Sequence, residues 1–175
     1  MAMPNPAPHI TEPMTMVTDY LMTALCVVLA VELLRKAGPS RRSSVALWAT
    51  SFLVAAAAAL AGGTAHGFKL YLGEGHAIIW KVTICSIGLT ALLMLIAGIR
   101  SAKWPTTTDR ARRKAGHQWL KAGLVASAAG VLIQRIGIGF HEHFNHNDIY
   151  HLVQMAGIYF FYRGALSLHD LIDES

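Results

Sequence analysis

Charged residues are scarce in this chain, and their scarcity excludes an ordinary soluble domain. Only 14% of the 175 residues are Asp, Glu, Lys or Arg and 54% are hydrophobic, whereas an average soluble domain carries about 25% charged residues. The sequence also lacks the ~10-residue alternating segments of membrane barrel strands. Its apolar stretches instead approach or exceed the ~18–20 residues that cross a bilayer core. We read five of them: 16–34, 44–68, 77–99, 118–139 and 149–168. We therefore expect residues 1–175 to form one all-α membrane domain, a polytopic bundle of five transmembrane helices.

Cysteine is nearly absent as well. Cys26 and Cys85 are the only two, each near the middle of a predicted span. Neither a disulfide framework nor a thiolate metal site can be built from them, so we expect both to pack as small apolar residues. The opening segment MAMPNPAPHITEP contains no Lys or Arg, which favours a first span that acts as an anchor over a cleaved signal peptide.

The excess of basic residues, a net charge of +5, is explained by membrane topology and does not indicate nucleic-acid binding. Two of the predicted loops carry these residues: Arg35, Lys36, Arg41 and Arg42 in the first, and Arg100, Lys103, Arg110, Arg112, Arg113 and Lys114 in the third. The N-terminus and the other two loops carry only Lys69. The positive-inside rule then places the N-terminus outside and the C-terminus inside. The third loop, RSAKWPTTTDRARRKAGH, is expected to touch anionic lipid headgroups.

Small residues predict which spans lie inside the bundle. The second span contains VALWATSFLVAAAAALAGGTAHGF, and the fourth carries a face of Gly123, Ala126, Ala129 and Gly130. Small side chains let neighbouring membrane helices approach closely. We therefore expect a compact bundle with the second and fourth spans in its interior.

Ionisable residues predict a site near the outer side of the membrane. Every span places one of them about one turn from its outer end: Asp19, His66, Lys81, Arg135 and His151. Charged groups at such a depth cost a few kcal/mol each unless they face a partner or a wet cavity. Lys81 and Arg135 have a second explanation, because long basic side chains can reach the interface. The inner halves of the spans are almost free of charge, so the layer is one-sided, as a functional site would be.

Four of the nine histidines lie in the segment HEHFNHNDIYHLVQ, residues 141–154. His141, His143 and His146 belong to the predicted outer loop, and helical spacing puts Asn147, Asp148, His151 and Gln154 on one face of the last span. Imidazole and carboxylate together suit zinc, and also iron or copper. A loop histidine by itself is usually only solvated, so the stronger candidates are His66 and His151 with Asp19 or Asp148.

Two of these segments resemble signatures of the superfamily of alkaline ceramidases and progestin/adiponectin receptors. They are GGTAHGF at the end of the second span and NDIYHLVQ at the start of the last. The resemblance implies a zinc ion held by three histidines and a lipid amide as substrate, with His66 and His151 as two of the ligands. The chain departs from that pattern: Asn147 stands in place of the third histidine, and Gly62 in place of a serine. No span-three residue matches the family's aspartate, and the family has seven spans.

Three functions follow from these observations. The first is a zinc-dependent membrane hydrolase acting on a lipid or amide, in which His66, His151 and one of His146, Asp148 and Asp19 hold the metal. Asp19 or Asp148 would be the general base, and Arg135 or Lys81 would stabilise an oxyanion or bind a headgroup. The second is a redox or pigment subunit, with His66 and His151 as axial ligands of a b-type haem. The third is a non-catalytic accessory subunit of a larger membrane complex or a homo-oligomer. All three place the protein among membrane lipids, in the bacterial inner (plasma) membrane, with the polar layer facing outside.

Overall fold

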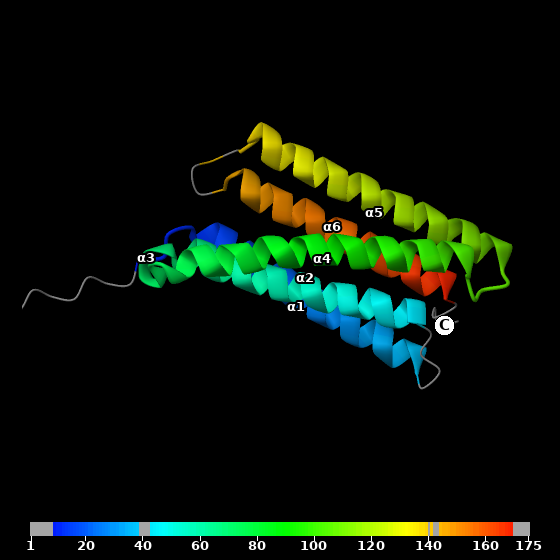
Figure 1. Cartoon of the computed structure of the whole chain (residues 1–175). Helices are drawn as coiled ribbons and strands as arrows, with labels where there is room; N and C mark the ends of the chain where they lie inside the picture. The colour runs from blue at the N-terminus through cyan, green and yellow to red at the C-terminus, as the bar shows by residue number, and fades with distance from the viewer. Residues whose placement is uncertain (1–8, 39–42, 140, 142–143, 170–175) are drawn as a thin grey trace, which may run out of the picture.

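The computed structural model describes residues 9–38, 43–139, 141 and 144–169, and over that part of the chain it is all-helical. Within the described residues, five helices are long and one is short, as Figure 1 illustrates. They are α1 (Pro13–Ala37), α2 (Ser43–Gly67), α3 (Lys69–Leu72), α4 (Gly75–Lys103), α5 (Arg110–Ile136) and α6 (His146–Leu168). Each of the five predicted spans lies within its own long helix, except that the second extends one residue beyond Gly67 and the fourth extends beyond Ile136 to residue 139.

The start of α5 corrects the prediction of a long basic loop. The connection after α4 is only residues 104–109, and the basic segment that follows is already helical. Asp109 caps this helix, because its side chain accepts a hydrogen bond of 2.7 Å from the backbone N–H of Ala111. Arg, Lys and Ala are also good helix formers. The helix therefore extends beyond the apolar segment by about two turns.

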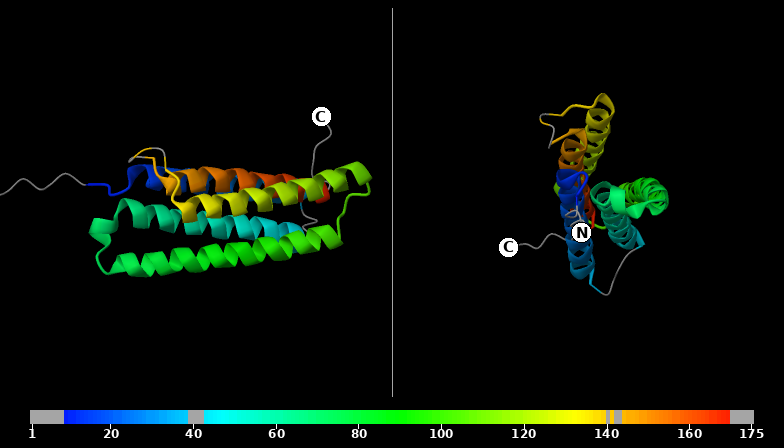
Figure 2. Two further views of the ribbon diagram at one scale, coloured as in Figure 1. Left: turned by 90° about the horizontal axis from the view of Figure 1, so that it is seen from above. Right: turned by 90° about the vertical axis from the view of Figure 1, so that its left-hand side faces the viewer.

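The long helices form a bent row in the order α4, α2, α1, α6, α5. α1 packs against α2 and α6, α2 packs also against α4, and α5 packs against α6. The end-on view in Figure 2 shows that the row curves, so that its two edge helices, α4 and α5, stand on either side of a concave flank. This arrangement matters for function because the concave flank contains the largest cavity described below.

Four of these helices, α1, α2, α4 and α5, are long and apolar enough to cross a membrane, within the residues that the structure describes. The fifth predicted span is present as a helix of 23 residues, but it does not belong to that set. Its first turns carry Asn147, Asp148 and His151, and its C-terminal half is largely buried, with Ile158, Gly164 and Ala165 among the buried residues. A helix enclosed by its neighbours can carry polar residues that a lipid-facing helix cannot.

Burial confirms one half of the small-residue prediction and corrects the other. In the most apolar window of α2, 56% of the residues are buried, whereas the figure for α5 is 11%. The second span is thus interior and the fourth is not. The glycines within α5 allow close contact with one helix only, α6. For example, a Cβ on Gly123 would lie 2.8 Å from the ring of Phe161 on α6. They bring α5 close to a single partner helix, and its other faces stay open.

The two cysteines differ in burial, as α2 and α5 do. Cys26 is fully buried in the core formed around Trp48 and Phe52, as expected. Cys85 is exposed on α4, where the prediction of a packed residue is wrong. The reason is the position of α4 at the edge of the row, where only one side of the helix meets protein.

Candidate functional site

A cavity of about 980 Å3 lies along the concave flank. Its wall on α4 extends from Trp80 to Ala102, which corresponds to about 33 Å along a helix axis. Most of the lining is apolar: Ile84, Ile87, Met94, Leu95, Ile99, Leu120, Leu124, Val131, Ile158 and Phe161 are among its residues. The polar lining gathers toward one end: Asp19, His66, Thr83, Gln134, Arg135, Asn147, His151 and Gln154. The cavity is therefore amphiphilic along its length.

Asp19 and His151 form the centre of the polar end. The Oδ1 atom of Asp19 lies 3.3 Å from Nε2 of His151, and the two side chains are 4% and 8% exposed. On the other side of the ring, Nδ1 of His151 lies 2.9 Å from the hydroxyl of Thr18. The second carboxylate oxygen of Asp19, Oδ2, is buried without a hydrogen-bond partner in the described residues. A buried histidine is thus held between α1 residues at both of its nitrogens.

The hydroxyl of Thr18 determines which nitrogen of His151 carries hydrogen. A hydroxyl has one hydrogen to donate, and that of Thr18 points to the backbone carbonyl of Thr15, 3.0 Å away. Thr18 therefore accepts a hydrogen bond from Nδ1 of His151. In the neutral ring Nε2 then has a lone pair, which faces the Asp19 carboxylate. Two lone pairs repel each other, so a proton or a cation must lie between or beside these atoms.

His66 lies on the same cavity wall and is oriented by a different acid. Its Nδ1 donates to the Oε2 atom of Glu12 across 3.0 Å, and its ring meets Trp80 edge-on with centroids 5.5 Å apart. Nε2 of His66 makes no hydrogen bond within the described part of the chain. Both histidines thus have one nitrogen fixed by a neighbour and the other available, which is the arrangement that metal-bound histidines usually show.

Asp148 and His146 do not line the cavity. The Oδ2 atom of Asp148 accepts a hydrogen bond of 2.7 Å from the backbone N–H of Asn145, and this contact completes a capping box at the start of α6. Asp148 is nevertheless fully buried, and its Oδ1 atom has no hydrogen-bond partner among the described residues. His146 begins the same helix and is half-buried. Of the three predicted candidates for the remaining ligand, only Asp19 meets His151 in the cavity.

The two basic candidates also separate. Arg135 is exposed on α5 and lines the polar end of the cavity, whereas Lys81 is exposed on α4 outside the lining. From α4 the cavity receives Trp80 and Thr83 instead. His141 forms a short bridge with Phe144 in the loop before α6, and His143 lies outside the described residues.

Zinc fits this set of donors in part. Neighbouring ligand atoms of a tetrahedral zinc ion, with bonds of about 2.0–2.1 Å, stand about 3.3 Å apart. The 3.3 Å between Asp19 Oδ1 and His151 Nε2 equals that spacing, and it exceeds the 2.7–2.9 Å or so of a charge-assisted hydrogen bond. However, no three His, Cys, Asp or Glu side chains within the described ranges lie close enough together to hold an ion. His66 shares the cavity, but it would have to approach the other two.

Sequence reasoning missed Thr18 and Glu12, the residues that orient the two histidines. Glu12 precedes the first apolar stretch and resembles an ordinary interfacial acid, and Thr18 resembles a small residue of a membrane helix. One signal was present. Thr18 directly precedes Asp19, the one acid in the first half of the first predicted span, and a hydroxyl beside a buried charge is a natural partner for the same site.

Comparison with known proteins assigns a family and leaves its activity open. The chain belongs to a family of unknown function, DUF6962, whose model matches residues 14–113 and 104–170. No curated protein and no solved structure matches the chain significantly. The function must therefore be argued from the geometry of the cavity and its polar end.

Proposed function

We propose that this member of the DUF6962 family is a zinc-dependent membrane hydrolase that cleaves an amide bond of a lipid. The observation that carries the proposal is the buried pair of Asp19 and His151, 3.3 Å apart, at the polar end of an apolar cavity. A buried carboxylate with an orphan oxygen is costly to maintain. Such a cost is expected where the group has a chemical task.

Asp19, His151 and His66 would hold the metal. The first two have the donor spacing of a tetrahedral site, and His66 is the third donor that the proposal requires. Its Nε2 is available because Glu12 binds Nδ1. When bound, zinc would supply a water of lowered pKa and polarise the carbonyl group of the substrate.

The residues of the chain then have separate tasks. Thr18 keeps Nε2 of His151 free of hydrogen, and Glu12 does the same for His66. The Oδ2 atom of Asp19 has no hydrogen-bond partner in the described residues, so it is placed to accept the proton of an attacking water. Gly62 leaves room beside this oxygen, since a Cβ there would lie 3.2 Å from it. In hydrolysis, the water oxygen bonds to the carbonyl carbon, the C–N bond breaks, and the amine leaves with the proton.

The shape of the cavity supports a lipid as the substrate. Its apolar wall is about as long as a bilayer core is thick, roughly 30 Å, and it lies between the edge helices α4 and α5, where lipid can enter from the side. An acyl chain along this wall would put its amide group at the level of Asp19 and His151. Arg135, exposed at that end, would bind the polar headgroup or the developing oxyanion.

The membrane topology belongs to the same proposal. With α6 as a fifth span enclosed by α1 and α5, the basic ends of α1 and α5 share one side of the membrane. The positive-inside rule makes that side the cytoplasm. The polar end of the cavity then opens near the outer face, with the N-terminus outside and the C-terminus inside.

The haem alternative has less support from the geometry. An axial ligand needs a nitrogen that points at iron, but Nδ1 of His151 is bound to Thr18 and the Asp19 carboxylate stands at Nε2. Iron would have to displace that carboxylate. For an accessory subunit, no observation explains why an acid with an unsatisfied oxygen should face a large cavity.

Hydrolysis by the purified protein tests the proposal. Full-length protein in a neutral detergent is incubated with N-acyl sphingosine carrying a fluorescent acyl chain, and the released fatty acid is measured with and without zinc. We expect release that a chelator abolishes, that zinc restores, and that His151→Ala lacks. Asp148→Asn is the matched control for Asp19→Asn, because it makes the same change in a second buried acid. Release that survives chelation, or that Asp19→Asn leaves intact, would overturn the proposal.

A further inference from the structure

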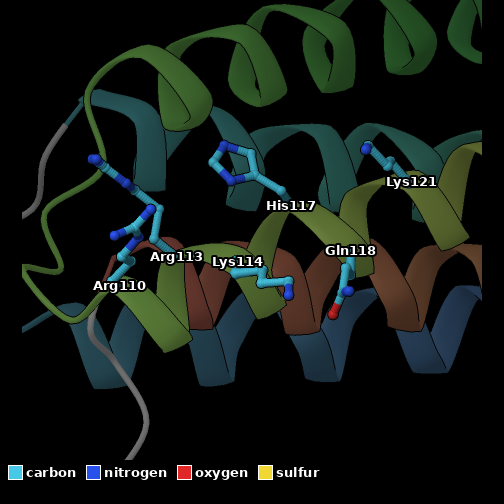
Figure 3. A pocket seen from close by; sticks show the side chains of 6 residues that line it. All are labelled: Arg110, Arg113, Lys114, His117, Gln118 and Lys121. Atoms are coloured by element: carbon cyan, nitrogen blue, oxygen red, sulfur yellow. The ribbon is translucent and has the colours of Figure 1, made fainter.

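A second polar feature lies at the opposite end of the bundle and does not belong to the cavity. The first three turns of α5 carry Arg110, Arg113, Lys114, His117, Gln118 and Lys121, which line a pocket of about 380 Å3. We call these residues the basic face. Their spacings of three, four, seven, eight and eleven residues from Arg110 put them on one side of the helix. Figure 3 shows that all of these side chains project from the same stretch of α5.

Among the residues that the structure describes, the cations of the basic face have no acidic partner. Within the described residues, no carboxylate forms an ion pair with Arg110, Arg113, Lys114 or Lys121. Arg112, which is not part of the basic face, lies 3.8 Å from Asp109. Like charges three or four residues apart repel one another on a helix. An anion that met several of these cations at once would remove that repulsion.

The position of the basic face indicates which anion would bind there. Lys121 lies eleven residues after Arg110, about 16 Å along the axis, and the exposed apolar residues Leu124 and Val125 follow in the next turn. Beside this boundary, the Arg163 guanidinium lies 5.3 Å from the ring centroid of Trp119, and tryptophan is typical of membrane–water interfaces. A change from basic to apolar on one exposed helix face is where the phosphates of a bilayer lie.

We propose that the basic face is a binding site for a phosphate group, carried by an anionic phospholipid or free in solution. Arginine offers planar pairs of donors to phosphate oxygens, and lysine contributes a point charge. The site is independent of the hydrolase proposal, since it shares no residue with the cavity. It would hold the start of α5 at the membrane surface. The same helix borders the cavity further along its length.

The test measures lipid retention by the full chain in a neutral detergent, using native mass spectrometry. Dioleoyl phosphatidylglycerol is compared with dioleoyl phosphatidylcholine, which has a phosphate but no net charge. The variant is Arg113→Gln with Lys114→Gln. Its control is Arg35→Gln with Lys36→Gln, which removes the same two charges from the end of α1 on the same side of the bundle. An exchange of types, Arg113→Lys with Lys114→Arg, keeps the charge. Elution volume and melting temperature must match wild type.

We expect wild type to prefer phosphatidylglycerol and the basic-face variant to bind it about 25-fold more weakly, since each cation near an anionic surface changes affinity about fivefold. The α1 control should stay within about twofold, and the exchange variant should bind well. Inorganic phosphate added as competitor identifies the source: displacement of the lipid assigns a site for soluble phosphate too, and no displacement assigns the headgroup. Equal losses in both double variants, or no preference for phosphatidylglycerol, would overturn the proposal.

Discussion

Replacing Asp19 with asparagine should stabilise the metal-free protein and remove its response to zinc. The carboxylate is buried, its Oδ2 atom has no hydrogen-bond partner in the described residues, and its Oδ1 atom faces a nitrogen lone pair across 3.3 Å. An asparagine amide is the same size, carries no charge and can donate to that lone pair. The amide oxygen would take the place of Oδ2 and still lack a partner, so the gain comes from the hydrogen bond that Nε2 of His151 then accepts; a buried acceptor left unsatisfied costs about 1–3 kcal/mol. Relief of that cost corresponds to a rise of about 2–12 °C in melting temperature for a chain of this length.

Zinc should raise the melting temperature of the wild type and leave that of Asp19→Asn unchanged. A ligand at 100 times its dissociation constant stabilises the folded state by about 2.7 kcal/mol, so wild type should melt higher with zinc than with a chelator. The Asp19→Asn protein should melt at one temperature under both conditions. Tryptophan fluorescence during heating in detergent measures this for both proteins.

Asp148→Asn provides the matched control, because the sign of its effect is reversed. Asp148 accepts from the backbone of Asn145 at the start of α6, and a negative charge at a helix N-terminus contributes about 0.3–1 kcal/mol. This variant should melt slightly lower than wild type and still respond to zinc. If Asp19→Asn melts lower than wild type and keeps its zinc response, the role assigned to Asp19 is refuted.

Three further substitutions test the surroundings of the site. Thr18→Val removes the acceptor that orients His151 and should weaken zinc binding about 10–100-fold in a competition titration. Unchanged affinity would show that the hydroxyl does not orient the imidazole ring. Glu12→Gln should weaken zinc binding by less than Thr18→Val, since Glu12 is 34% exposed. A loss of zinc affinity as large as that of Asp19→Asn would instead make Glu12 a ligand. Gly123→Ala should destabilise the packing of α5 on α6 by about 1–3 kcal/mol, because its Cβ would lie 2.8 Å from Phe161. Gly88→Ala meets nothing within 4 Å and should be neutral or stabilising in the same melting experiment.

The sequence was sufficient for the helices and for part of the polar layer. Long apolar stretches leave few alternatives to helices in a bilayer, and isolated acids and histidines within them stand out. On this ground we expected Asp19, His66 and His151 to converge. The structure brings Asp19 and His151 to 3.3 Å, but within the described residues His66 does not join them within reach of one ion. Lys81 shows the limit, because depth along a helix does not tell which way a side chain points. Lys81 is exposed and is not among the residues that line the cavity.

The remaining differences come from tertiary packing. Whether α6 can carry polar residues depends on the helices around it, since an enclosed helix tolerates residues that an exposed one does not. The glycines of α5 indicated close packing, but a small-residue face reports one close contact and does not report burial on all sides. The tasks of Thr18 and Glu12 depend on residues more than 50 positions away in the chain, and no local pattern reveals such pairs.

The zinc content of the purified protein tests the central claim most directly. Full-length wild type, Asp19→Asn, His151→Ala and Asp148→Asn are purified in parallel without added metal, and zinc per chain is measured by inductively coupled plasma mass spectrometry. We expect about one zinc ion per chain in wild type and in Asp148→Asn, and almost none in the other two. Wild type without zinc that also fails to bind it on addition would contradict the claim, as would equal zinc in all four proteins.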